Sequence, residues 1–256
     1  DPGIGRTQAV VRYDYGGSGN FAEIVILDGA DTGLERGTVG NPRVSLGMSW
    51  FIDRFAIGAE ANCCNSGATV EPFTIAPDGT FYVADGYGLD YIIQYDANGN
   101  YLRHFGGHGK GAAQFECCHG ITVDYRAATP TLLITSRTAN CFKRFTLEGE
   151  HIETIALPSC YICRPVIKNG KLYFAVIVTR DWGTYDGMLA VLDENNKVLS
   201  MPGGSTPTYQ GNQLVAPVYD QKTFLNPHDV CIDDDENIYI PQWNSGKTYP
   251  LKLIRV

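Results

Sequence analysis

The sequence lacks the features that would place it across a membrane or on a nucleic acid. None of its apolar runs approaches the about 18–20 residues that a spanning helix needs. Basic residues are in the minority, with 20 Lys and Arg against 28 Asp and Glu, and the net charge is −8 at pH 7. Nucleic acids and anionic membrane surfaces attract a basic face. We therefore expect no nucleic-acid partner and no membrane span.

The chain also lacks an initiating methionine, a signal peptide and any Asn-x-Ser/Thr sequence. Because it begins at Asp1, we expect a processed or truncated chain. It does contain eight Cys, an even number that is high for a cytosolic protein of this size. We expect an extracellular, cell-surface or periplasmic location, with metal ligation as the competing use of the cysteines.

What the sequence is rich in favours strands over helices. Aromatic residues make up 11% of it, with 15 Tyr, and there are 29 Gly for tight turns. In the N-terminal part, two β-rich runs around the glycine-rich segment 15–20 predict a hairpin. The predicted strands of this part are 9–14, 21–27, 43–48 and 51–57.

From residue 72 onward, the sequence repeats a unit of four short strands separated by turns. Aligning the units places one residue of each in the same slot, at the head of its first strand. These slot residues are Phe73, His119, Arg164 and His228, which lie 46, 45 and 64 residues apart. The third unit is longer because it carries an inserted loop at 203–222. A period in the forties with four strands per unit is typical of β-propellers.

We therefore predict an all-β fold, a β-propeller of four-stranded blades, as a single domain over residues 1–256. Residues 1–71 would form the irregular first blade or blades and the closure, and residues 72–256 the four recognisable repeats. The last repeat has only three strands, so a strand from the N-terminal part would complete it. The count is then five or six blades.

Propeller geometry predicts that many chemically active residues share one mouth. The loop that enters the first strand and the turn between the second and third strands open on the same face. The entering loops carry Cys63, Cys64, Cys117, Cys118, His119, Cys160, Cys163, Arg164, His228 and Asp229. The second-to-third turns carry Tyr87, Arg137, Trp182 and Trp243. We expect a polar concavity, with Arg164, Trp182 and Trp243 at its rim, that takes a peptide or protein ligand.

His119 and His228 occupy equivalent slots and can be interpreted in two ways. Neutral imidazole is the commonest metal ligand, so two histidines in register indicate a metal site. Alternatively the slot residue packs around the channel, as Phe73 must do in the same slot.

The cysteine pairs allow three interpretations. Disulfides could join neighbouring entering loops, for example Cys117 or Cys118 to Cys160 or Cys163. A Cys–His site could hold zinc or copper, and Cys160-x-x-Cys163 could be a redox pair. Disulfides are the favoured interpretation. Cys231, inside a first strand, is predicted to be a buried free thiol.

The units resemble NHL repeats, with a Pro-led first strand, a Val-Ala-Asp second strand and an Asp-x-x-Gly turn. Within that group, four motifs resemble the peptidylglycine α-hydroxyglycine amidating lyase family. They are Val83-Ala-Asp-Gly-Tyr87, Gln114-Phe-Glu-Cys-Cys-His-Gly120, Thr135-Ser-Arg137 and Asn226-Pro-His-Asp-Val230. The resemblance covers roughly residues 72–256.

The resemblance implies roles for five residues. That family holds zinc with three His, of which His119 and His228 match two. Its catalytic base would be Tyr87, its substrate-binding Arg would be Arg137, and its calcium-associated acidic residue would be Asp229. The family's first zinc His and its second active-site Arg have no counterpart here, so a Cys thiolate would have to complete a zinc site.

Three functions follow from these residues. The first is a secreted or surface NHL-type propeller that acts as a binding or assembly module through its Cys- and His-rich mouth. The alternative is a zinc-dependent lyase that cleaves a peptidyl-α-hydroxyglycine into a peptide amide and glyoxylate. A third is a copper or other redox metal site made of Cys and His. The sequence leaves open whether the protein is an enzyme and whether it forms homo-oligomers.

Overall fold

The computed structural model describes residues 73–184, 186–219, 223–243, 245–246 and 250–255, together with the backbone of four N-terminal strands. The chain forms two compact units, Asp1–Val70 and Glu71–Val256. The single domain over 1–256, the closure by an N-terminal strand and the number of blades stay predictions.

The N-terminal unit contains one antiparallel sheet with the strand order β3-β2-β1-β4. Its strands are β1 (Gln8–Tyr15), β2 (Asn20–Leu27), β3 (Thr32–Thr38) and β4 (Ser45–Met48). The predicted β1–β2 hairpin is confirmed. Strand β3 was not predicted, because Gly33 and Gly37 and its charged residues interrupt the apolar alternation. The predicted strand at 51–57 and the cysteines Cys63 and Cys64 lie outside the described residues.

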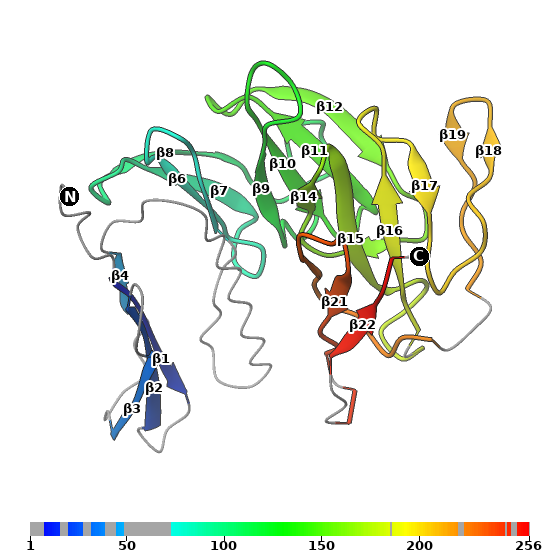
Figure 1. The fold of residues 1–256 in the computed structure, drawn as a ribbon. Helices are drawn as coiled ribbons and strands as arrows, with labels where there is room; N and C mark the ends of the chain where they lie inside the picture. Colours follow the sequence, from blue (N-terminus) through cyan, green and yellow to red (C-terminus); the bar gives the residue numbers. More distant parts are fainter. Residues whose placement is uncertain are drawn as a thin grey trace. The chain divides into compact units, whose positions relative to one another are not determined.

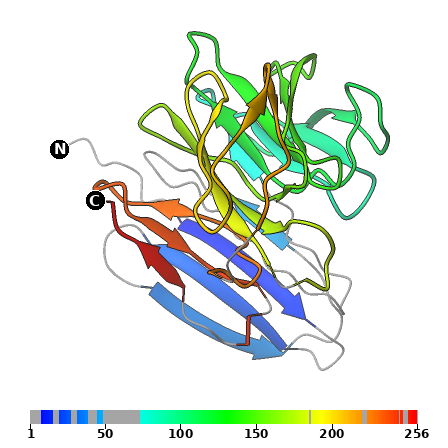
Figure 2. The same ribbon diagram turned by 90° about the vertical axis from the view of Figure 1, so that its right-hand side faces the viewer.

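The second unit begins with two four-stranded antiparallel sheets, which come one after the other along the chain. Figures 1 and 2 show them from two directions. The first sheet consists of β5 (Phe73–Ile75), β6 (Phe81–Ala84), β7 (Tyr91–Tyr95) and β8 (Tyr101–Gly106). The second sheet consists of β9 (Ile121–Asp124), β10 (Thr131–Ser136), β11 (Cys141–Phe145) and β12 (His151–Ala156). In both sheets each strand pairs with the next one along the chain, as the blades of a propeller do.

Two further sheets and a small hairpin follow in the described part of this unit. The third sheet consists of β13 (Tyr161–Ile162), β14 (Val166–Lys168), β15 (Lys171–Val178), β16 (Met188–Leu192) and β17 (Val198–Ser200). The fourth consists of β20 (Cys231–Ile232), β21 (Ile238–Ile240) and β22 (Leu251–Leu253). The hairpin consists of β18 (Tyr209–Gln210) and β19 (Gln213–Leu214). It lies in the inserted segment that we expected to be a loop, and such short strands leave no alternating pattern to detect.

Alternation along the strands determines which face of each sheet is buried. In β6, Tyr82 and Ala84 are buried whereas Phe81 and Val83 are only half-buried. The turns between strands follow from Asp and Gly. Between β7 and β8, for example, the Asp96 carboxylate accepts hydrogen bonds from the main-chain N–H groups of residues 98 and 100, and Gly99 adopts a φ of 84°.

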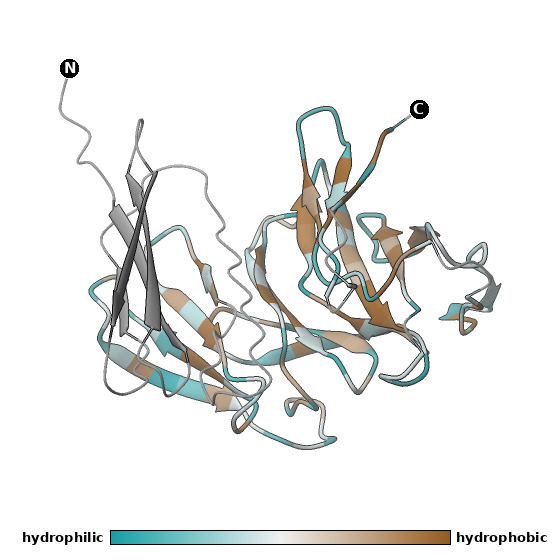
Figure 3. Cartoon of the chain, turned by 90° about the horizontal axis from the view of Figure 1, so that it is seen from below, coloured by the Kyte–Doolittle hydropathy of each residue, from teal (hydrophilic) through white to brown (hydrophobic). Residues whose placement is uncertain are grey.

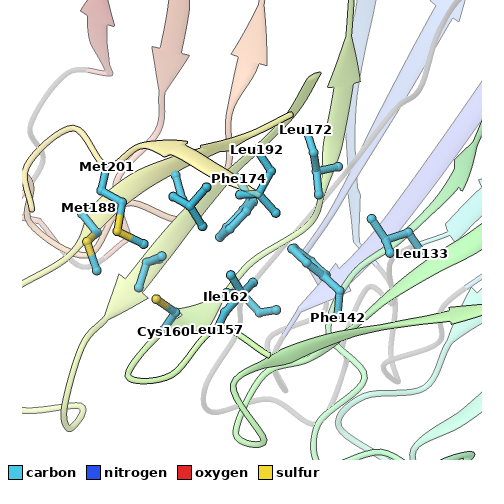
Figure 4. Close-up of a cluster of buried hydrophobic side chains, with 13 residues drawn as sticks. Leu133, Phe142, Leu157, Cys160, Ile162, Leu172, Phe174, Met188, Leu192 and Met201 are labelled. Atoms are coloured by element: carbon cyan, nitrogen blue, oxygen red, sulfur yellow. The ribbon is translucent and has the colours of Figure 1, made fainter. Parts of the chain in front are cut away.

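Consecutive sheets pack face to face and share apolar clusters. Phe105 of the first sheet contacts Phe145 of the second at a ring distance of 5.4 Å. Phe142 of the second sheet meets Phe174 of the third edge-on at 4.9 Å, within the cluster drawn in Figure 4. A third cluster joins the third and fourth sheets. In Figure 3 the hydrophobic residues, coloured brown, are likewise concentrated on the strands.

The first strands of consecutive sheets are also joined directly. The main-chain N–H of Val123 in β9 donates to Oγ1 of Thr74 in β5 across 3.2 Å. The hydroxyl of Thr122 donates to the carbonyl of Pro165, just before β14, across 2.6 Å. First strands that adjoin in this way surround the axis of a propeller. The predicted all-β class and the propeller blades are thus confirmed, and in the described residues no helix is long and apolar enough to cross a membrane.

Cys231 departs from its prediction. It is exposed, whereas Val230 beside it is buried. Val230 directly precedes β20, and successive side chains of an extended chain point to opposite sides, so Cys231 lies on the side opposite to Val230. Its position within a first strand therefore does not bury it.

Candidate functional site

Tyr87 lies on the turn between β6 and β7. This turn packs closely against the loop before β9 because residue 86 is glycine. The Asp85 carboxylate accepts the N–H of Leu89 across 2.9 Å and holds the turn together. A Cβ on Gly86 would lie 2.5 Å from the carbonyl oxygen of Cys118. Glycine at this position therefore lets the turn approach the loop before β9. As a result Tyr87, which is 46% exposed, contacts the His119 ring at 5.3 Å in a T-shaped arrangement.

Asp90 anchors the loop that carries His119. This buried carboxylate accepts the N–H of Cys118 across 2.7 Å and lies 2.7 Å from Nδ1 of the exposed His108. Sequence reasoning missed Asp90. The available signal was an acidic residue directly before an alternating apolar strand, at the end of a Gly-containing turn.

Arg137 is the central side chain of the site. It follows β10 directly and is only 2% exposed. Its Nη2 lies 2.5 Å from Nδ1 of His119, and its Nε donates to the carbonyl of Ile162 across 3.2 Å. Its Nη2 also donates to Sγ of Cys163 across 3.5 Å. The main-chain N–H of Arg137 donates to the carbonyl of Cys117, which adopts a left-handed φ of 62°.

The contact with Arg137 determines the state of the His119 ring. A guanidinium can only donate, so Nδ1 of His119 accepts and the neutral ring carries its hydrogen on Nε2. Burial lowers the pKa of His119 well below its ordinary value of 6.5, and the charges of Arg137 and His228 lower it further. His119 is therefore neutral near pH 7.

His228 and His119 meet, as their equivalent slots predict. The two rings lie 5.4 Å apart and are nearly perpendicular, at 80°. His228 is held from the fourth sheet, since its main-chain N–H donates to the carbonyl of Pro241 across 2.9 Å. Residues from three sheets thus converge, although they are far apart in the sequence.

Arg164 and Asp229 form an ion pair beside these histidines. Nη2 of Arg164 lies 2.9 Å from Oδ2 of Asp229, and both side chains are less than one fifth exposed. The pair joins the loops that enter β14 and β20. Arg164, predicted at the rim, and Asp229, predicted as a calcium-associated residue, therefore neutralise each other in this structure.

The two tryptophans have different environments. Trp182 is 47% exposed, lies over the Arg137 guanidinium at 5.9 Å and contacts the ring of Tyr161 at 5.7 Å. Trp243 is half-buried and packs against the cluster between the third and fourth sheets. The structure thus brings Trp182 to the Arg137 site, while Trp243 contributes to the core.

The predicted disulfides between neighbouring entering loops do not form among the described cysteines. Cys117, Cys118, Cys160 and Cys163 carry no disulfide bond to one another. The reason is packing, because Cys118, Cys160 and Cys163 belong to three different apolar clusters. Burial also raises the pKa of Cys160 to about 12. Its thiol is therefore protonated and a poor nucleophile for redox exchange.

The geometry of the cluster bears on the predicted metal sites. In the described parts of the chain, no three His, Cys, Asp or Glu side chains come close enough together to hold a metal ion. At His119, the nitrogen nearest Arg137 accepts a hydrogen bond, which leaves the other nitrogen protonated rather than available for coordination. These residues alone do not fit a zinc site with three protein ligands, so we derive no chemical step through a metal. Zinc, calcium and copper stay predictions of the sequence.

The fold and this cluster define an all-β protein of propeller blades, with a buried His–Arg layer beneath exposed aromatic side chains. Searches of family models and of curated proteins find no match to the chain. Solved structures show low similarity. One is a catalytically inactive virginiamycin B lyase from Staphylococcus aureus with quinupristin. It has 12% identity and a TM-score of 0.48, and the alignment covers 93% of this chain and 63% of that chain.

Two other solved structures have similar values. A protein of unknown function from Bacteroides caccae has 13% identity and a TM-score of 0.47, with 94% of this chain and 85% of that chain covered. A chain of a nidogen/laminin complex has 12% identity and a TM-score of 0.43, with 93% and 86% covered. The present chain spans less than two thirds of the lyase chain, at 63%.

Proposed function

We propose that this protein is a propeller-type binding module that takes a peptide ligand at the mouth formed by Tyr87, His119, Arg137, Trp182 and His228. The observation that carries the proposal is the support beneath two exposed aromatic rings. Trp182 rests on Arg137 and Tyr87 rests against His119. Both supporting side chains are 2% exposed.

This arrangement has the features of a binding hot spot. Aromatic side chains contribute much of the affinity at protein interfaces, and they do so best when they are held in place before the partner arrives. The Arg137 and His119 side chains hold the aromatic rings through contacts within the buried layer. Main-chain and side-chain groups of a peptide could then bond to the Tyr87 hydroxyl and the Trp182 indole N–H. The location outside the cytoplasm stays a prediction of the sequence, since the described cysteines form no disulfide with one another.

A selection from a display library of random peptides about twelve residues long tests the proposal. We expect enriched peptides whose binding is weakened at least about tenfold by Trp182→Ala and by Tyr87→Ala. Tyr101→Ala is the matched control, because Tyr101 is also about half exposed, at 55%, but lies on β8. If no enriched peptide distinguishes Trp182→Ala from Tyr101→Ala, the mouth is not a peptide site.

A second candidate function is the lyase that the sequence motifs imply. The observation in its favour is that Tyr87, Arg137 and His228 all surround His119. In this reaction Tyr87 would relay a proton: its phenol oxygen accepts the proton of the substrate's α-hydroxyl group while its own hydroxyl hydrogen passes to the amide nitrogen. The C–O bond becomes the carbonyl of glyoxylate, the C–N bond breaks with its electron pair, and the amide nitrogen takes up a proton. Arg137 would bind the substrate carboxylate.

Glyoxylate release from a peptidyl-α-hydroxyglycine measures this second function directly. Assays of the intact protein with and without added zinc would include Tyr87→Phe, which keeps the ring but removes the proton acceptor. We expect turnover in the wild type and loss of at least about two orders of magnitude in Tyr87→Phe. Absence of glyoxylate under both conditions excludes the lyase and leaves the binding proposal intact.

A further inference from the structure

A polar groove of about 780 Å³ lies between the outer edge of the second sheet and the inserted hairpin. One side consists of residues 153–156 of β12, and Asn212, Gln213 and Leu214 of the hairpin also line it. Asn195, in the turn between β16 and β17, adds a further amide side chain. The groove does not include the mouth residues.

The groove follows the free edge of β12. This strand is the last in its sheet and, among the described strands, pairs only with β11. Successive side chains of a strand point to opposite faces. A groove lined by four consecutive residues therefore runs along the edge of the strand and not along one face of the sheet. Hydrogen-bonding groups of the main chain are available at such an edge.

The pairing register identifies which groups point into the groove. The N–H of Leu157 donates to the carbonyl of Asn140 across 2.8 Å, so these two residues form a hydrogen-bonded pair. In an antiparallel ladder such pairs alternate with pairs that turn their main-chain groups outward. From the register of β11 and β12, the outward residues are Thr154 and Ala156.

The side chains of the groove suit an extended peptide. Carboxamides such as those of Asn195, Asn212 and Gln213 carry both a donor and an acceptor, as a peptide group does. The charged lining residue, Glu153, is paired with Arg144 at 2.7 Å. The described lining residues include no aromatic ring on which a sugar could stack. The chemistry therefore favours an uncharged polypeptide over a glycan or a charged ligand.

We propose that the groove binds an extended, uncharged peptide segment of a partner protein, which adds as a strand to the free edge of β12. Its main chain pairs with the N–H and C=O groups of Thr154 and Ala156, and its side chains meet the amides of the hairpin. A segment opposite residues 153–156 would be about 13 Å long at about 3.3 Å per residue. This mode of recognition obtains affinity from the main chain and selectivity from the flanking side chains.

The substitution Thr154→Pro tests the proposal with little effect on the sheet. It removes one outward N–H, whereas the ladder to β11 uses the neighbouring residues, and proline is tolerated on edge strands. Peptides would be selected from the same random library with the full-length protein. We expect a class of peptides whose affinity falls about tenfold or more in Thr154→Pro but is unchanged in Trp182→Ala.

The matched control is His104→Pro. His104 pairs with Ile93 in the first sheet as Thr154 pairs with Lys143 in the second. The N–H of Gly107 donates to the main-chain carbonyl of Asp90 across 2.8 Å, which makes them a hydrogen-bonded pair. His104 is therefore likewise an outward residue of the edge strand β8. Of these two edge strands, only β12 has the inserted hairpin beside it. His104→Pro should therefore leave the affinity of the selected peptides unchanged.

A second measurement uses the wild-type protein alone. Bound peptide should slow hydrogen exchange at the N–H groups of Thr154 and Ala156 but not at His104. Every second N–H of a bound peptide strand would point towards β12. Methylating that set of nitrogens should reduce binding, whereas methylating the alternate set should leave it unchanged. Three results would each overturn the proposal. The first is that no enriched peptide loses affinity in Thr154→Pro, and the second is that methylation of the peptide nitrogens does not alter binding. The third is that oligosaccharides protect the N–H groups of Thr154 and Ala156 from exchange.

Discussion

The guanidinium of Arg137 lies 2.5 Å from Nδ1 of His119 and keeps the imidazole neutral, with its hydrogen on Nε2. A buried cation and a buried imidazole are adjacent here, beneath the exposed Tyr87 and Trp182 rings. The pair joins the loop before β9 to the end of β10. Its electrostatics can be tested separately from any ligand.

Substituting Arg137 by Met should raise the pKa of His119 towards its ordinary value. The variant loses a neighbouring positive charge that now disfavours the imidazolium, although burial continues to lower the pKa. Proton NMR titration of the imidazole signals measures the change, and the signals of the exposed His104 and His108 serve as internal controls. An unchanged titration of His119 would show that Arg137 does not set its charge state. We also expect a loss of about 1–3 kcal/mol in the free energy of unfolding, because the Ile162 carbonyl loses its donor.

Acid should weaken the fold through Asp124. Burial tends to raise the pKa of this carboxyl group, but hydrogen bonds from Arg126 and Arg144 outweigh it and lower the pKa to about 2. The folded state therefore binds fewer protons than the unfolded state. The stabilisation is complete above the unfolded pKa of about 3.9 and is lost as the pH falls through about 2.

Asp124→Asn should thus lower the free energy of unfolding at pH 7 by about 2 kcal/mol and flatten its dependence on pH between about 5 and 2. Urea denaturation at a series of pH values measures both effects. Asp235→Asn is the control, since Asp235 is exposed and should change stability by less than about 0.5 kcal/mol. Parallel pH profiles for Asp124→Asn and the wild type would contradict the prediction.

Gly86→Ala should disturb the turn that presents Tyr87. The added Cβ would lie 2.5 Å from the Cys118 carbonyl oxygen, so the turn must move. We expect a destabilisation of about 1–3 kcal/mol, together with weaker binding of peptides selected at the mouth. Gly183→Ala is a suitable control, because its Cβ would meet only the Asp181 carboxylate, at 3.3 Å. Equal effects of the two substitutions on stability and binding would rule out this packing constraint.

Alkylation should separate two of the thiols. Cys231 is exposed, whereas Cys160 is fully buried with a pKa of about 12. At pH 8 under native conditions, iodoacetamide should modify Cys231 within minutes and leave Cys160 intact until the protein is unfolded. Peptide mass spectrometry after brief labelling identifies the sites, with Cys231→Ser as the control. Rapid native labelling of Cys160 would contradict its burial.

Much of the fold could be predicted because its signals are local. The alternation at Tyr82 and Ala84, and the turns that contain Gly99 and its counterparts, are visible in the sequence. The slot alignment likewise placed His119 and His228 together, because equivalent positions of propeller blades converge on the axis. These predictions required only that the repeated units were aligned correctly.

The parts that could not be predicted depend on contacts between distant segments. Asp90 binds the N–H of a residue 28 positions later, and no local pattern indicates that pairing. The proposed disulfides were wrong for Cys118 and Cys160 because nearby loops need not share one apolar cluster. Cys231 was misplaced because its strand buries the other face.

The inserted hairpin is fixed at its base and open at its tip. The Tyr209 hydroxyl accepts the N–H of Val198 across 2.7 Å, and Tyr209 and Leu214 pack against the cluster between the second and third sheets. Asn212, at the turn, lines the groove instead. A fluorescent dye attached through a cysteine at position 212 would therefore sit on an anchored arm beside the groove. Its emission would report occupancy of the groove without depending on the motion of the arm itself.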